Sequence, residues 1–331
     1  MRPHFLATAA LAAFALLAAA PNAQDAKALK GTVRIDGSST VYPITEAAAE
    51  EFSKVAEKVN VTVGVSGTGG GFKRFGAGEL DVADASRCIK KAEIEAAKSR
   101  NIAFIELPIA FDGLTIVVNT GNTWVKQLTV AQVKKIYSAA DPAKTWKDVD
   151  PSWPAEAIKL YSPGTDSGTF DYFKEVVVGK DGKIRSDLSV SEDDNVLVKG
   201  VAGDVNAIGF FGFAYYVENK EKLTCVPVVN PATGAAVTPS HDTIEKATYA
   251  PFSRPLFIYV NKGALDKPQV KAFVDFYMAN AAKFAEEVGY VKLPADLYDR
   301  AKANLAAGKT GTQMLDENGK ERPGALADLY K

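Results

Sequence analysis

The fold of this chain is decided at residues 35–43, IDGSSTVYP, where an apolar strand passes into a helix through a turn of glycine, serine and threonine. After this turn, Ile44 and Phe52 recur at the spacing of one helical face. Two later segments repeat the design: residues 65–73, VSGTGGGFK, and residues 161–169, YSPGTDSGT. A strand, a turn and a helix in this order form the repeating unit of an α/β sheet.

Each of these three turns has the chemistry of a small-anion site. The N-terminus of a helix carries about four unpartnered N–H groups and roughly half a positive charge. Glycine lets the backbone approach a ligand, and hydroxyl groups add donors, so tetrahedral oxyanions bind there with little side-chain charge. Ordinary helix capping explains any one turn alone, but three exceed what capping requires. None matches the phosphate loop of nucleotide-binding proteins, so a small oxyanion is expected.

The rest of the chain alternates short apolar runs with amphipathic segments, which predicts an α/β protein. A capping box of Thr129 and Gln132 precedes one of the expected helices. The chain is large for a single core and has no Gly/Ser linker, so we expect two α/β lobes with a cleft between them. Strands are expected at residues 32–35, 61–65, 102–107, 114–118, 158–161, 224–229 and 256–260, and helices at 44–59, 130–136, 170–178 and 270–288.

The composition favours binding over catalysis. Lys and Arg number 39 against 40 Asp and Glu, so a nucleic-acid partner is not expected. Two cysteines and two histidines cannot supply a cysteine-rich zinc site or an iron–sulfur cluster. Because His4 lies in the N-terminal leader, a Ser-His-Asp or Cys-His mechanism would depend on His241 alone. We therefore expect no enzyme activity, no catalytic residue, no cofactor and no bound metal.

Residues 1–23 have the pattern of a secretory signal peptide. Arg2 supplies a basic start, an apolar run follows, and small residues lead to a cleavage site near Ala23. The alternative, a buried alanine-rich helix, is disfavoured by the position at the extreme N-terminus. No other segment approaches ~20 uninterrupted apolar residues, so a soluble, exported, periplasmic protein is expected. Export permits a disulfide between Cys88 and Cys225, and the sequence leaves open whether they pair.

A fourth element, residues 80–87, LDVADASR, ends a strand-like run with a hydroxyl group and a guanidinium. The planar fork of arginine suits bidentate contact with an oxyanion. A salt bridge with a neighbouring acid is the alternative role for Arg87.

These motifs together resemble those of the periplasmic phosphate-binding proteins, the substrate-binding components of the phosphate ABC importer. The similarity covers essentially the whole chain after the leader, and the motifs are specific as a set. They are GSSTVYP at 37–43, SGTG at 66–69, DVADASR at 81–87, DSGTF at 166–170, NAIGFF at 206–211 and SRPLFIYV at 253–260.

The resemblance implies a two-lobed type II periplasmic binding protein fold that closes around one dehydrated phosphate. Lobe one would be residues 24–112 plus 254–331 and lobe two residues 113–253, joined by hinge strands at 111–118 and 253–260. It further implies a monomer that delivers inorganic phosphate to an inner-membrane ABC permease. The ligand-binding residues implied are Ser39, Thr40, Ser66, Gly67, Thr68, Arg87, Ser167, Gly168 and Thr169.

Two departures from the family pattern bear on selectivity. Some members carry an arginine where this chain has Pro163, and an aspartate where Ser86 stands. Phosphate near neutral pH carries a proton that a buried carboxylate can accept, whereas sulfate carries none. Asp84 and Asp166 are the candidate acceptors, and both this choice and a ligand contact of Ser86 stay open. The alternative functions are a receptor for sulfate, molybdate or tungstate, an exported phosphatase, and a sensor or adhesin of the same fold.

Overall fold

The computed structural model describes residues 27–165, 167–179, 181–191 and 193–331. The expected signal peptide at residues 1–23 and the candidate Asp166 therefore lie outside the described residues. Across the part of the chain that is described, no helix combines the length and the apolarity of a membrane span.

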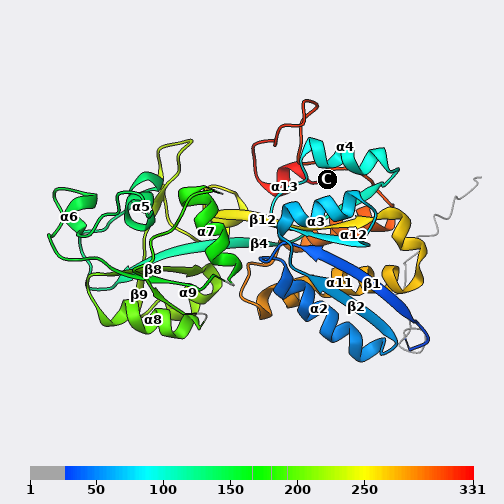
Figure 1. Ribbon diagram of the computed structural model, residues 1–331, viewed down its shortest axis with the longest axis horizontal. Coiled ribbons are helices and arrows are strands. Elements are labelled where there is room, and N and C mark those ends of the chain that lie inside the picture. Colours follow the sequence, from blue (N-terminus) through cyan, green and yellow to red (C-terminus); the bar gives the residue numbers. More distant parts are fainter. Residues whose placement is uncertain (1–26, 166, 180, 192) are drawn as a thin grey trace, which may run out of the picture.

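The chain forms two α/β halves that lie side by side (Figure 1). The first half contains both ends of the described chain and a sheet in the order β2-β1-β3-β12-β4, in which β12 runs antiparallel to both neighbours. Its strands are β1 (Gly31–Gly37), β2 (Val59–Gly64), β3 (Val82–Ala85), β4 (Phe104–Asn119) and β12 (Ser253–Asn261). Its helices are α2 (Tyr42–Val55), α3 (Gly67–Gly76), α4 (Lys91–Ser99), η1 (Lys262–Asp266), α11 (Pro268–Glu287), α12 (Ala295–Ala306) and α13 (Leu326–Leu329).

The second half continues the same sheet in the order β4-β8-β6-β7, with β9 also on β4, and has a small sheet in the order β11-β10-β5. Its strands are β5 (Leu128–Thr129), β6 (Lys159–Ser162), β7 (Ser189–Val190), β8 (Ala207–Gly212), β9 (Leu223–Cys225), β10 (Val228–Val229) and β11 (Ala236–Val237). Its helices are α5 (Val130–Tyr137), α6 (Trp146–Val149), α7 (Gly168–Val178), α8 (Asp194–Gly203), α9 (Phe213–Asn219) and α10 (His241–Glu245).

Strand β4 belongs to both halves. Two strands were expected here, at 102–107 and 114–118, and that prediction was wrong because one strand of 16 residues covers the region. It pairs with β12 over its first part and with β8 from Leu114 onward. The expected strand at 224–229 is likewise divided into β9 and β10, because Pro227 between them has no N–H to give to a ladder.

Aromatic side chains fill the core of each half. In the first, Phe52 of α2 meets Phe273 of α11 edge-on, with ring centroids 5.4 Å apart. In the second, Phe173 of α7 stacks on Phe210 of β8 at 3.7 Å. The helix expected behind the Thr129 capping box is confirmed as α5, and the Gln132 N–H donates to the Thr129 hydroxyl at 3.1 Å.

The two cysteines are free thiols, which answers the question that the sequence left open. Cys88 is buried in the first half, and Cys225 is half-buried in the second. Burial raises the pKa of the Cys88 thiol to about 12, so this side chain behaves as an apolar core residue at neutral pH.

One acid, Asp84, is enclosed within the sheet of the first half. It lies in β3 between Gly37 of β1 and Ile258 of β12, and its relative exposure is 1%. Neither carboxylate oxygen has a hydrogen-bond partner among the described residues. Burial raises the pKa of Asp84 to about 8; the Thr45 hydroxyl opposes this rise, and the charge of Asp36 adds to it. Asp84 is therefore protonated in the folded protein over a pH range in which the unfolded chain ionises it.

We expect Asp84→Asn to change how stability depends on pH. Between about pH 4 and pH 8 the folded state keeps a proton that the unfolded chain releases, so the free energy of unfolding of the native protein falls as pH rises through this window. Asparagine has nearly the same shape and no charge, so the variant should lose this slope, and its stability relative to the native protein should rise by on the order of 4 kcal/mol between pH 5 and pH 8. Urea unfolding at pH 5 and pH 8 measures both effects, and an equal loss of stability at the two pH values would contradict the prediction.

Candidate functional site

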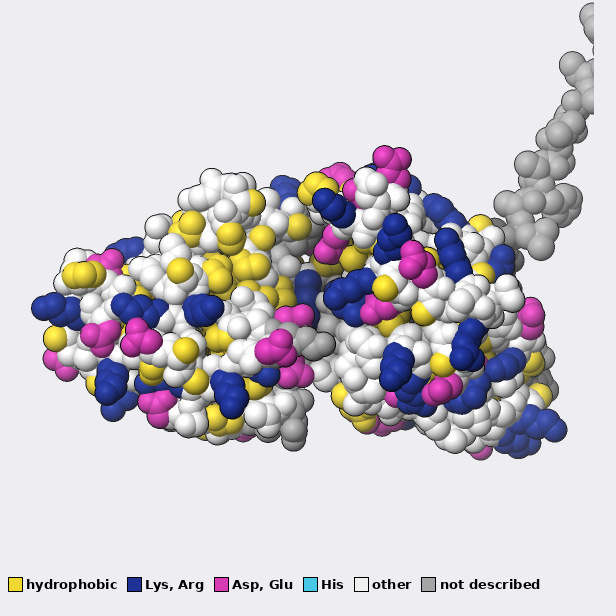
Figure 2. Space-filling view, turned by 45° about the horizontal axis from the view of Figure 1, so that its top comes forward, with side chains coloured by type: hydrophobic (Ala, Val, Ile, Leu, Met, Phe, Trp, Pro, Cys, Tyr) yellow, Lys and Arg dark blue, Asp and Glu magenta, His cyan; other side chains and the backbone are white. Residues whose placement is uncertain are grey.

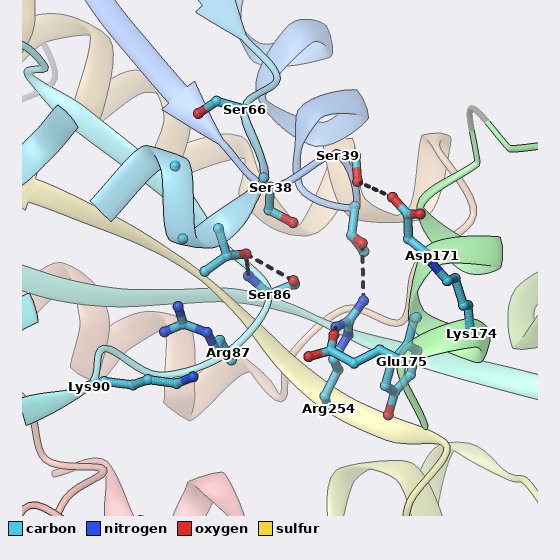
Figure 3. A pocket seen from close by; sticks show the side chains of 16 residues that line it. Ser38, Ser39, Ser66, Ser86, Arg87, Lys90, Asp171, Lys174, Glu175 and Arg254 are labelled. Atoms are coloured by element: carbon cyan, nitrogen blue, oxygen red, sulfur yellow. Dashed lines mark hydrogen bonds and ion pairs between the residues drawn. The ribbon is translucent and has the colours of Figure 1, made fainter. Parts of the chain in front are cut away.

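A cavity of about 430 Å³ lies between the two halves. The first half lines it with the turns before α2 and α3 and with the loop after β3, and the second half lines it with the first turns of α7 (Figure 3). The lining residues are Ser38, Ser39, Thr40, Ser66, Gly67, Thr68, Gly69, Gly70, Ser86, Arg87, Lys90, Asp171, Tyr172, Lys174, Glu175 and Arg254. Six of the nine residues predicted to bind the ligand are in this set.

Two helices begin at the cavity without a side-chain cap. The residue before α2 is Val41 and the residue before α3 is Ser66, and neither side chain accepts a hydrogen bond from its helix. Gly67 has φ +75°, a conformation that side-chain-bearing residues rarely adopt, and it turns the backbone into α3 at the cavity wall. The partial positive charges of two helix N-termini therefore act on the same space.

The third turn lies beside the cavity and contacts the first turn. The Ser167 hydroxyl accepts from the Thr169 N–H at 3.2 Å, which is ordinary capping of α7. The Thr40 hydroxyl donates to the Gly168 carbonyl at 3.4 Å, so this turn joins the second half to the first. Ser167, Gly168 and Thr169 are thus placed next to the predicted site and outside the lining of the cavity.

Arg87 lines the cavity and also forms the salt bridge that the sequence offered as its alternative role. Its Nη2 and Nη1 groups donate to the two carboxylate oxygens of Glu93, at 2.7 and 3.0 Å. Nη1 also donates to the Cys88 carbonyl at 3.0 Å, and the guanidinium lies 5.3 Å from the Phe72 ring centroid. All of these contacts are with residues of the first half.

A second arginine, Arg254 of β12, was missed by the sequence analysis. Its Nη2 donates to the Thr40 hydroxyl at 3.0 Å, and its Nε donates to Asp112 at 3.3 Å. Its guanidinium carbon lies 3.7 Å from the centroid of the Tyr172 ring, which is close cation–π contact. The available signal was a cationic residue at the start of a buried apolar strand, in a segment already expected to join the lobes.

The carboxylates that border the cavity were also not predicted from the sequence. Asp171 and Glu175 lie one helical turn apart on α7, and the Ser39 hydroxyl donates to Asp171 at 3.1 Å (Figure 3). Asp84, one of the two predicted proton acceptors, is buried in the sheet and does not line the cavity. Ser86 does line it, and its N–H and hydroxyl both lie within hydrogen-bond distance of the Thr68 hydroxyl.

The donor set suits an anion. Serine and threonine hydroxyl groups, two helix N-termini and four cationic side chains surround the cavity, against two acidic ones. On the face drawn in Figure 2, basic and acidic side chains are interspersed over both halves, without a single large patch of one sign. Among the residues that the structure describes, no cluster of three or more His, Cys, Asp or Glu side chains is placed to hold a metal ion.

Comparisons with known proteins agree with this geometry. Residues 22–281 match the model of the PBP superfamily domain. The chain is 51% identical to the protein SphX of Synechococcus elongatus, over 93% of this chain and 90% of SphX. It is 42% identical to the phosphate-binding protein PstS of Staphylococcus saprophyticus, over 90% of this chain and 92% of that protein.

Among solved structures, that of "a possible phosphate binding protein" from Planctomyces limnophilus has a TM-score of 0.83 and 43% identity, and the match covers 85% of this chain and 99% of that one. The expected architecture is confirmed, since the two α/β halves are those of the two-lobed periplasmic binding protein fold. The chain belongs to the PBP superfamily and, within it, to the family of SphX and the phosphate-binding protein PstS.

Proposed function

We propose that this protein binds inorganic phosphate in the cavity between its halves and delivers it to an ABC permease of the inner membrane. The observation that carries the proposal is the convergence of two helix N-termini without side-chain caps and two arginines on one cavity. Such donors can replace the hydration shell of a tetrahedral oxyanion. The relative named phosphate-binding protein PstS supports phosphate as the ion. The protein would act in the periplasm as a monomer without catalysis, after removal of residues 1–23.

The proposed lobes follow the strands that join the halves. Residues 24–112 plus 254–331 would form lobe one and residues 113–253 lobe two, with the hinge at 111–118 and 253–260 in β4 and β12. Rotation about these strands would open and close the cavity. The proposed ligand contacts from lobe one are Ser39, Thr40, Ser66, Gly67, Thr68 and Arg87, and on closure Ser167, Gly168 and Thr169 would join them from lobe two.

Asp171 and Glu175 are the proposed proton acceptors in place of Asp84, and Asp166, outside the described residues, stays a candidate. Asp171 and Glu175 come from lobe two and border the cavity, where hydrogen phosphate offers an O–H donor and sulfate offers none. A carboxylate facing a fully ionised oxyanion repels it, so this arrangement favours phosphate. A receptor for sulfate, molybdate or tungstate is the alternative within the binding class.

Calorimetry on protein stripped of bound ligand tests the function. We expect phosphate to bind at micromolar dissociation constants or tighter, about −8 kcal/mol or stronger, and the other three oxyanions to bind at least tenfold more weakly. A titration with phosphate that gives no heat of binding would contradict the proposal. Tighter binding of sulfate, molybdate or tungstate than of phosphate would favour the alternative. Steady release of phosphate from a phosphomonoester would instead indicate an exported phosphatase.

We expect Arg87→Ala to weaken phosphate binding more than Ser39→Ala. A charged donor contributes roughly twice as much as a neutral one, so losses on the order of 100-fold and 10-fold are expected. Because Arg87→Ala leaves Glu93 without its partner, the double change Arg87→Ala with Glu93→Gln controls for an unpaired acid. Equal losses in the arginine and serine variants, measured by phosphate calorimetry, would mean that Arg87 does not contact the ion.

Gly168→Ala should hinder the approach of the lobes. An alanine Cβ at this position would lie 2.6 Å from the Thr40 Cα, so the first turn and α7 could not keep their contact. We expect phosphate affinity to fall at least tenfold, while the thermal midpoint stays near that of the native protein. Gly203→Ala is the matched control, since nothing lies within 4 Å of its Cβ. Equal phosphate affinities in the two variants would contradict the prediction.

A further inference from the structure

Arg254 stands where the two halves meet. It is the second residue of β12 and lies directly opposite Asp112 of β4 in the antiparallel register, and these two strands join the halves. Its side chain is only 15% exposed and points toward the cavity between the turn before α2 and helix α7 (Figure 3). A cation in this position can contact both lobes at once.

The contacts of Arg254 are divided between the halves. On the side of the first half, Nη2 donates to the Thr40 hydroxyl at 3.0 Å, at the N-terminus of α2. On the side of the second half, the guanidinium carbon lies over the ring of Tyr172 of α7, at 3.7 Å from the ring centroid. Nη1 lies 3.9 Å from the Glu175 carboxylate, beyond hydrogen-bond distance.

Asp112 fixes the position of this charge. The carboxylate is 1% exposed; Oδ2 accepts from Arg254 Nε at 3.3 Å, and Oδ1 has no hydrogen-bond partner among the described residues. Burial raises the pKa of Asp112, and the adjacent guanidinium opposes that rise. A buried carboxyl group needs hydrogen-bond partners, and the Arg254 Nε group is the one that Oδ2 has. The guanidinium is therefore held at the junction, where groups of both halves can contact it.

Arg87 provides the contrast. Its partners Glu93, Cys88 and Phe72 all belong to the first half, so these contacts do not depend on where the second half lies. The contacts of Arg254 with Thr40 and Tyr172, by comparison, exist together only when the halves adjoin. A ligand shifts a conformational equilibrium only through interactions that differ between the two states. Of the two arginines, Arg254 alone meets this condition.

Building on the proposed function, we infer that Arg254 is the positioning residue that couples phosphate binding to lobe closure, whereas Arg87 serves capture by the first lobe. Phosphate at the N-terminus of α2 would lie against Thr40 and so beside the guanidinium that Thr40 contacts. The anion would then strengthen the contact between Arg254 and the first turn while Tyr172 holds the same guanidinium to α7.

Two double variants, each of which replaces one arginine–acid pair by neutral side chains, test this role. Arg254→Gln with Asp112→Asn removes the buried charge pair at the junction without leaving Asp112 unpaired, and Arg87→Gln with Glu93→Gln makes the same exchange within one lobe. Phosphate calorimetry gives the affinity, and small-angle X-ray scattering with and without saturating phosphate gives the change in radius of gyration. Arg254→Lys is a third variant, which keeps a charge beside Asp112 but loses the planar stacking on Tyr172.

We expect phosphate to reduce the radius of gyration of the native protein and of the Arg87/Glu93 variant at saturation, although the latter binds at least tenfold more weakly. The Arg254/Asp112 variant should keep its radius unchanged even at saturation, and Arg254→Lys should show a partial reduction. The inference would be overturned if phosphate reduced the radius of gyration of both Arg254 variants as much as that of the native protein. It would also be overturned if the two neutral pairs showed the same change in radius of gyration. A native protein that binds no phosphate would refute the proposed function itself, which calorimetry on that protein alone reveals.

Discussion

The antiparallel pairing of β4 with β12 is the contact on which the rest of the structure depends. Every residue of β4 before Asn119 is buried, and so are the last apolar residues of β12. The two halves are therefore joined through two paired strands that both contribute to the core. The cavity lies beside these strands, where the sheet of one half passes into the sheet of the other. Asp112 and Arg254 face each other at that point, so the fold itself places a charge pair at the site.

The local features of the fold and the site could be predicted from the sequence. Turn chemistry and helical periodicity are carried by neighbouring residues, which is why the two cavity-lining turns and helices α2, α5, α7 and α11 were found. The unbroken course of β4 through Pro108 could not be predicted, because a proline inside a strand pattern argues against a continuous strand. In the structure, a bulge in the pairing falls opposite Pro108, where Phe257 pairs with it while Leu256 pairs with Ala110. The extra residue of this bulge is Ile109 of β4, next to the proline, and the strand it is paired against, β12, is distant in sequence.

The site residues that were not predicted were missed for a similar reason, because contacts between distant segments bring them together. Arg254 and Asp112 are 142 positions apart in the chain, and Ser39 and Asp171 are 132 apart. No spacing pattern relates such pairs, since only the crossing of the chain between the halves brings them together. The third turn illustrates the converse, because its hydroxyl chemistry matches that of the first turn although the Ser167 hydroxyl caps its own helix. Local chemistry therefore indicates what a turn can bind, and the tertiary contacts decide whether it faces the cavity.

The electrostatics of the cavity explain how a nearly neutral chain can hold an anion. Each arginine at the cavity is already paired, Arg87 with Glu93 and Arg254 with Asp112, so neither adds an unbalanced charge. What they add is direction, because a paired guanidinium still presents N–H groups at fixed angles. Because the charges are balanced, long-range electrostatic steering of an anion towards the cavity is weak. Selection among anions must therefore come from direct contacts inside the cavity. In the proposed closure of the lobes, exclusion of water would strengthen each of these oriented contacts. The same few hydrogen bonds would then set both the affinity and the conformational change.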